Sequence, residues 1–252
     1  MDPKLLIATP CYGGLATTEY TESMLRLSKT DLVFDLMLVS NESLVSRARN
    51  SCVAQFLGNE TYTHLFFIDS DIGFLPQEVG RLLVKDAAVV AGVYPKKKRN
   101  WDKGARMNGG SGEDLQFNTL DYVLNVLEEG ETFEDEVFDG LVTDGFMRVA
   151  YAGTGFMLIR REVFDALRRK FPEDHYANDA DGYEAEGLKG HFWNFFEPMV
   201  HPQSKRFLSE DFGFCYKWRA CGGEIWVNAL SQLTHVGRAV YEGDVGRLRK
   251  DA

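Results

Sequence analysis

The chain has 252 residues, with 28 lysines and arginines against 38 aspartates and glutamates, so its formal net charge is −10. A hydrophobic content of 44% can fill a core, which excludes a mainly disordered chain. A negative surface repels phosphates, so we expect no nucleic-acid partner. No apolar run is long enough to span a membrane, and the run near the N-terminus is too short for a signal peptide. These features predict a soluble, cytoplasmic protein.

The first 95 residues alternate strand-like and helix-like segments. Apolar runs predict strands at 4–10, 34–40, 64–69 and 87–94. Helices are expected at 17–27, from a cap at Asn41 or Ser43 to Leu57, and from Pro76 onward. This alternation indicates right-handed crossovers and a mostly parallel sheet. Ligands of such sheets lie at the carboxyl ends of the strands.

The middle of the chain has a different composition. Residues 95–112 have no apolar periodicity, which predicts a long mobile loop able to close over a ligand. A short helix is expected at 120–127, and the carboxylates of 128–139 indicate a solvated surface. The remaining expected elements are a strand at 148–159 interrupted by two glycines, a helix at 161–170, a helix from a Ser209 cap to Cys221, and a strand at 224–230.

The sequence Asp69-Ser70-Asp71 stands where the apolar strand HLFFID ends. Two carboxylates one residue apart at the carboxyl end of a strand can hold a hard divalent cation. The same pair can also serve only to cap a turn. An EF-hand loop is excluded, because Gly73, Phe74 and Gly80 occupy positions that need a ligand, a glycine and a glutamate.

Several segments together resemble, in the same order, a GT-A glycosyltransferase. They are ATPCYGG, SLVSRARNSCVAQFL, HLFFIDSDIGF, AAVVAGVYPKK, AYAGTGFMLIRREVF, FLSEDFGFCYKWRACGGEIWVN and LTHVG. The resemblance implies an α/β fold with a Rossmann-like, mostly parallel central sheet flanked by helices. It also implies that residues 1–252 form a single domain, with a nucleotide-binding half at 1–95 and an acceptor-side half at 146–252.

On the donor side, the resemblance implies a divalent metal, Mn²⁺ or Mg²⁺, between the DxD motif and the diphosphate of a nucleotide-sugar. Asp71 is expected to contact the metal directly, Asp69 to contact metal or ribose, and His235 to be the third ligand. The further expected donor contacts are Thr9, Pro10, Tyr12, Arg49 and Ser70. A structural histidine, a surface tyrosine and a solvated arginine are the simpler alternatives for three of these residues.

On the acceptor side, the sequence SED resembles the ED motif of inverting GT-A enzymes. The resemblance implies that Asp211 takes the proton from the acceptor hydroxyl, with Glu210 beside the acceptor. The other expected acceptor contacts are Gly153, Thr154, Gly155 and Trp193. Carboxylates in a first helical turn are also favoured by the helix dipole alone, and the Gly-Thr-Gly segment can be a plain β-bulge.

The sequence thus predicts a metal-dependent glycosyltransferase that moves a sugar from a nucleotide-sugar to a hydroxyl of a glycan or other acceptor. A UDP-sugar is the favoured donor and inversion the favoured outcome. Two alternatives stay open. One is a nucleotidyltransferase or metal-dependent phosphohydrolase, and the other is a non-catalytic carbohydrate-binding module. The sequence does not specify the oligomeric state.

Overall fold

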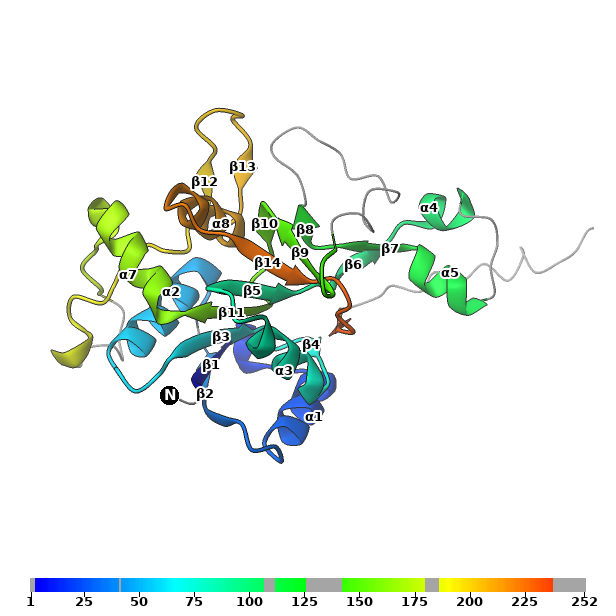
Figure 1. Ribbon diagram of the computed structural model, residues 1–252, viewed down its shortest axis with the longest axis horizontal. Helices are drawn as coiled ribbons and strands as arrows, with labels where there is room; N and C mark the ends of the chain where they lie inside the picture. The colour runs from blue at the N-terminus through cyan, green and yellow to red at the C-terminus, as the bar shows by residue number, and fades with distance from the viewer. Residues whose placement is uncertain (1–2, 41, 107–111, 126–141, 180–185, 238–252) are drawn as a thin grey trace, which may run out of the picture.

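A computed structural model describes residues 3–40, 42–106, 112–125, 142–179 and 186–237. At its centre lies a seven-stranded sheet with the strand order β2-β1-β3-β11-β5-β14-β9 (Figure 1). The strands are β1 (Lys4–Cys11), β2 (Val33–Ser40), β3 (His64–Ile68), β5 (Val89–Gly92), β9 (Phe146–Val149), β11 (Phe156–Arg160) and β14 (Ile225–Asn228). Only β9 and β11 run against the other five. The predicted α/β fold with a mostly parallel sheet is therefore confirmed.

Helices cover both faces of this sheet (Figure 1). The helices are α1 (Thr18–Leu27), α2 (Val45–Leu57), α3 (Pro76–Lys85), α7 (Arg161–Lys170) and α8 (Glu210–Ala220). Side chains of α2, α7 and α8 share one apolar cluster with the sheet, and those of α1 and α3 share another. None of the described helices is long and apolar enough to cross a membrane.

The apolar run of β3 is explained by burial on both faces. Leu65 and Phe67 belong to the core under α2, α7 and α8, whereas Phe66 and Ile68 belong to the core under α1 and α3. Successive side chains of a strand point to opposite faces, so a strand that is covered twice needs apolar residues at every position. This pattern made the central strands predictable.

The segment that follows β5 differs from its prediction. Instead of a long loop over 95–112 and a helix over 120–127, the described part forms β6 (Pro95–Arg99), α4 (Trp101–Arg106), α5 (Gly112–Asn118), β7 (Leu120–Tyr122) and β8 (Leu124–Asn125). β6 pairs with β7, and the side chains of residues 96–99 are exposed. β6 forms through backbone pairing with β7, so its sequence shows no apolar alternation that would predict a strand. Residues 107–111 and the acidic stretch 128–139 lie outside the described residues.

The interruption expected within the strand at 148–159 is confirmed, because the chain bends at residues 153–155 between β10 (Tyr151–Ala152) and β11. One other local prediction was wrong. The residue before α2 is Leu44 rather than Ser43, and Asn41 lies outside the described part. The remaining short elements are η1 (Tyr12–Gly14), β4 (Ile72–Gly73), η3 (Pro172–Asp174), η4 (Glu186–Leu188), β12 (Met199–Val200), β13 (Phe207–Leu208) and β15 (Thr234–His235).

Candidate functional site

The carboxyl ends of β1, β2, β3 and β5 meet at one edge of the sheet, where a cavity of about 190 Å³ lies. Six of the seven predicted donor contacts line this donor-side cavity: Pro10, Tyr12, Arg49, Asp69, Ser70 and Asp71. The other lining residues are Cys11, Val39, Glu42, Ser43, Val45 and Ala48. Thr9 does not line it. Its side chain is fully buried, and its hydroxyl lies 2.8 Å from that of Tyr20.

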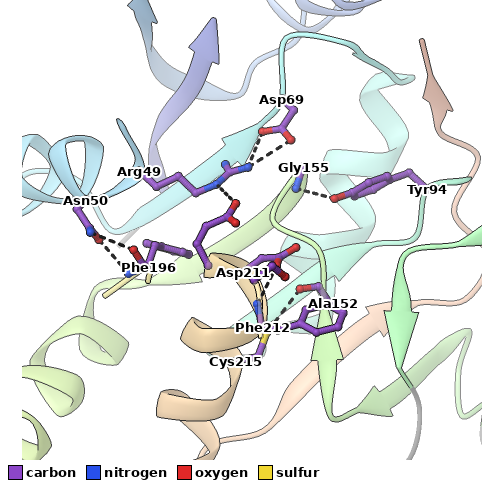
Figure 2. A network of polar contacts seen from close by, with 12 residues as sticks. Arg49, Asn50, Asp69, Tyr94, Ala152, Gly155, Phe196, Asp211, Phe212 and Cys215 are labelled. Carbon is purple, nitrogen blue, oxygen red and sulfur yellow. Dashed lines mark hydrogen bonds and ion pairs between the residues drawn. The ribbon is translucent and has the colours of Figure 1, made fainter. Parts of the chain in front are cut away.

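Arg49 reaches from α2 into the centre of this region (Figure 2). Its Nη2 donates to both carboxylate oxygens of Asp69, at 3.0 and 3.3 Å, and its Nε lies 3.5 Å from Glu210 Oε1. Burial alone would lower the pKa of Arg49, but the Asp69 and Glu210 carboxylates raise it, so the guanidinium stays charged. Its Nη1 is buried and has no hydrogen-bond partner in the described part of the chain.

The second aspartate of the motif has different partners. β15 pairs with β4, which places His235 Nε2 3.5 Å from Asp71 Oδ1. Lys97 Nζ, from β6, contacts the other oxygen of Asp71. Burial tends to raise the pKa of Asp71, but hydrogen bonds from His235 and Lys97 outweigh it and lower this pKa. Asp71 therefore remains a carboxylate over a wide pH range.

His235 is held by a backbone carbonyl. Its Nδ1 lies 2.7 Å from the carbonyl oxygen of Pro95, and because a carbonyl only accepts, Nδ1 must carry the proton of this bond. The hydrogen bond to Asp71 requires a ring that is protonated on both nitrogens. In the neutral ring, which is the form that binds a metal, Nε2 is instead an acceptor that faces the carboxylate of Asp71. Two acceptors at this separation are compatible with a shared cation. A backbone carbonyl bonded to the opposite ring nitrogen is also usual for a histidine that binds metal.

A metal site with three protein ligands is not formed by the residues that the structure describes. Asp69 is paired with Arg49. Asp71 and His235 are then the two described residues of the predicted metal site that face each other. A carboxylate oxygen and an imidazole nitrogen form a donor set that suits Mn²⁺. These two residues therefore fit the predicted cation, and further coordination positions would be left for a ligand.

Asp211 lies in the first turn of α8, the helix whose Glu210 is paired with Arg49 (Figure 2). Its Oδ1 accepts hydrogen bonds from the Ser209 hydroxyl and, at 2.8 Å, from the Phe212 N–H. Burial raises the pKa of Asp211 and the neighbouring charge of Glu210 adds to the increase, although the Ser209 hydrogen bond opposes it. The carboxylate is consequently a stronger base than an ordinary aspartate.

The Gly-Thr-Gly segment contacts Tyr94, a residue that the sequence analysis did not identify as part of the site. The Gly155 N–H donates to the Tyr94 hydroxyl at 3.0 Å, and the Asp69 N–H donates to the Gly155 carbonyl at 2.9 Å (Figure 2). A Cβ at Gly153 would lie only 2.2 Å from this hydroxyl. The hydroxyl of Thr154 is buried and has no partner among the described residues. Tyr94 follows the buried strand β5, and this position was the available signal.

Trp193 lies among different residues. Its ring packs edge-on against His175 at 5.1 Å between centroids, and its indole N–H donates to the Gly190 carbonyl at 3.2 Å. No described contact joins it to Asp211 or to the donor-side cavity. The structure thus brings Glu210, Asp211 and the Gly-Thr-Gly segment to the edge that holds the donor residues, and it places Trp193 apart from them.

Comparison with known proteins gives a match in structure only. No protein-family model and no curated protein sequence matches this chain. Among solved structures, GalNAc-T7 with UDP, GalNAc and Mn²⁺ matches with a TM-score of 0.50 and 13% identity, over 94% of this chain and 44% of that one. The chain has a GT-A-like fold. A197 from STIV also matches, with a TM-score of 0.45 and 15% identity, over 96% of this chain and 98% of that one.

This chain spans less than half the length of GalNAc-T7, and at this identity the likeness shows the fold alone. The fold agrees with the resemblance seen in the sequence segments. The chemistry must be argued from the residues at the edge of the sheet.

Proposed function

We propose that this chain is a metal-dependent glycosyltransferase that moves a sugar from a nucleotide-sugar, with a UDP-sugar favoured, to a hydroxyl of a glycan or other acceptor. The observation that carries the proposal is the meeting of two kinds of carboxylate at one edge of the sheet. Asp71 faces a histidine across a gap that suits a cation, and Asp211 is partly buried and has a raised pKa. Such a pair suits a reaction that needs both a cation and a base.

The donor-side cavity supports the nucleotide part of this proposal. Pro10 lies near the end of β1 and Tyr12 directly follows this strand, where the exposed ring of Tyr12 can stack on a base. The unpartnered Nη1 of Arg49 is a buried donor that needs an acceptor, and a phosphate or ribose oxygen would supply it. In this proposal residues 1–95 form the nucleotide-binding half, and residues 146–252 form the acceptor-side half.

Asp71 and His235 would hold the divalent metal, and Asp69 would contact the ribose or the metal. When bound, the metal neutralises the charge that develops on the leaving diphosphate. Lys97, which already contacts Asp71, adds a positive charge from β6 to the same place. An acidic protein needs such local cations to receive a diphosphate.

Asp211 would act as the general base of the transfer. The acceptor hydroxyl gives its proton to the Asp211 carboxylate while its oxygen bonds to the anomeric carbon. The bond between that carbon and the diphosphate oxygen breaks, and the nucleoside diphosphate leaves with the electron pair. A base and a leaving group on opposite faces of the sugar correspond to inversion. Glu210 and the Gly-Thr-Gly segment are the proposed acceptor neighbours.

The test is slow hydrolysis of nucleotide-sugars, which requires no known acceptor. The chain is incubated with a panel of UDP-, GDP-, CMP- and dTDP-sugars in Mn²⁺, Mg²⁺ or EDTA, and release of the nucleotide is measured. We expect release from a UDP-sugar that depends on the metal and is lost in Asp71→Asn. Asp31→Asn, at an exposed site outside the cavity, is the matched control and should behave like the wild type. Absence of release from every donor would contradict the proposal.

A further inference from the structure

A second cavity, of about 470 Å³, borders the same helix as the donor-side cavity. Arg49 lines one cavity and its neighbour Asn50 lines the other. The second cavity lies between the start of α2 and two irregular segments of the acceptor-side half. Its lining residues are Leu44, Ser46, Arg47, Asn50, Glu173, Asp174, His175, Tyr176, Asn194 and Glu197.

A buried lysine fixes one wall of this cavity. Lys217 is only 4% exposed, and its Nζ donates to Asp174 Oδ2 at 2.7 Å and to the Asn194 carbonyl at 2.8 Å. The same nitrogen lies 2.5 Å from Glu197 Oε1. Three acceptors saturate the three donors of an ammonium group. Lys217 thereby fixes the positions of the Asp174 and Glu197 carboxylates.

Two asparagines fix the adjoining wall. Asn50 is buried, its Oδ1 accepts from the Phe196 N–H at 2.9 Å, and its Nδ2 donates to Asn194 Oδ1 at 3.1 Å. Asn194 Nδ2 in turn donates to the Glu197 carboxylate. The wall is therefore a connected polar network rather than a set of independent surface residues. Burying so many polar groups contributes little net stability compared with apolar packing, so a stable fold does not require it.

The network leaves hydrogen-bond acceptors for a ligand. A carboxylate has about four acceptor positions, and Lys217 and Asn194 use only some of those on Asp174 and Glu197. The rings of His175 and Tyr176 add flat surface beside these acceptors. A ligand that donates several hydrogen bonds and has a compact, partly apolar ring suits such a surface.

The charges of the lining select among ligand classes. Glu173, Asp174 and Glu197 would repel a phosphate or a carboxylate. Lys217 balances part of this negative charge, and Arg47 is paired with Glu42 at 2.6 Å. Leu44 is the only aliphatic residue among the described residues of the lining, which disfavours a lipid or an apolar peptide. None of the described lining residues forms a group that could hold a metal ion. A neutral, hydroxyl-rich molecule can use the remaining acceptors, and an organic cation is the competing ligand class that the test must exclude.

We infer that the second cavity binds a neutral sugar unit through the carboxylates of Asp174 and Glu197 and the amide of Asn194. Because α2 separates it from the donor-side cavity, this sugar is not the one that is transferred. If the chain is a transferase, the bound unit is a remote part of a glycan acceptor, and this one assignment rests on the proposed function. The binding itself does not.

The test uses the full chain without nucleotide or metal, so it does not depend on donor binding. Maltotriose, mannotriose, galactotriose and chitotriose are titrated by calorimetry and by saturation-transfer NMR, with spermidine and inorganic phosphate as cationic and anionic probes. We expect one trisaccharide to bind with a Kd below about 10 mM, and the two ionic probes not to bind at this site. Glu197→Gln should weaken that binding at least about tenfold by removing a charged acceptor.

Glu173→Gln, at an exposed site on the rim, is the second variant if Glu197→Gln does not fold, and it should weaken binding severalfold. Glu162→Gln, exposed on α7 and outside the cavity, should leave it unchanged. Three results would overturn the inference. They are binding of none of the four trisaccharides, sugar binding that survives in both cavity variants, and binding of spermidine that Glu173→Gln abolishes.

Discussion

Asp71 and Asp211 lie at the same edge of the sheet, yet their surroundings act on them in opposite directions. Asp71 lies between Lys97 and His235, and these partners lower its pKa. Asp211 is partly buried beside another carboxylate, Glu210, and its pKa is raised. The same side chain is thus suited to hold a cation in one place and to accept a proton in the other. The residues around each aspartate, and not the residue type, therefore give the two carboxylates different pKa values.

The largest expected effect is on the proton acceptor. Asp211→Asn keeps the size of the side chain but cannot take a proton, so turnover should fall by about 10² to 10⁴. The dissociation constant of the donor should change little, because Asp211 is not among the residues that line the donor-side cavity. Steady-state kinetics and donor titration measure the two quantities separately.

The stability of this variant provides the control. A raised carboxyl pKa means that the folded state disfavours the ionised form, so the ionised Asp211 costs stability at neutral pH. That cost is relieved as the pH falls through its pKa. Asp211→Asn should therefore be at least as stable as the wild type at pH 7. A clear loss of stability with normal turnover would assign Asp211 a structural role at the start of α8.

The next effect concerns the cation side. His235→Ala removes one of the two residues that face the proposed metal, so Mn²⁺ affinity in the presence of UDP should fall by about 10- to 100-fold. Calorimetric titration of Mn²⁺ measures this change. His175→Ala, whose ring packs on Trp193 away from the donor-side cavity, is the control. Equal affinities in the wild type and His235→Ala would make His235 only a structural residue.

A stability effect tests the close contact between Tyr94 and Gly153. In Gly153→Ala the new Cβ would lie 2.2 Å from the Tyr94 hydroxyl, and the required shift should lower the free energy of unfolding by about 1 to 3 kcal/mol. Denaturant unfolding measures it. Gly80→Ala, with no atom near its Cβ on helix α3, should instead stabilise by up to about 1 kcal/mol. Two equal effects would show that the close approach of Tyr94 is not restrictive.

The smallest effect is a shift in pH dependence. Turnover should fall on the acid side as Asp211 becomes protonated, at a pH above the usual aspartate pKa of about 3.9. Glu210→Gln removes the neighbouring negative charge, so this limb should move to lower pH. Glu224→Gln, paired with Arg148 in another part of the molecule, should not move it. A limb that stays in place would mean that Glu210 does not tune the base.

Whether an element could be predicted from the sequence depended on the interactions that stabilise it. β3 could be predicted, because both of its faces are buried and its residues are apolar throughout. β6 could not be predicted, because its exposed lysines give no apolar alternation. This strand forms by pairing with β7, about 20 residues later along the chain. The division of residues 148–159 could be predicted from its two glycines, but the close approach of the Tyr94 hydroxyl to Gly153 from a distant part of the chain could not.

The candidate site shows the same contrast. Residues at or just after the carboxyl ends of buried strands, such as Pro10 and Asp69, could be grouped in advance, because the carboxyl ends of parallel strands meet. The separate partners of the two motif aspartates could not be foreseen. They depend on where Arg49, Lys97 and His235 arrive from other parts of the chain.

The most direct test of a cation-dependent nucleotide site at Asp71 is a calorimetric titration of UDP into the wild type and Asp71→Asn, with and without Mn²⁺. We expect Mn²⁺ to strengthen UDP binding by the wild type and to have no effect on Asp71→Asn, while both proteins show the same thermal unfolding. UDP affinity that is independent of Mn²⁺ in the wild type, or an equal gain from Mn²⁺ in Asp71→Asn, would contradict the assignment of the site.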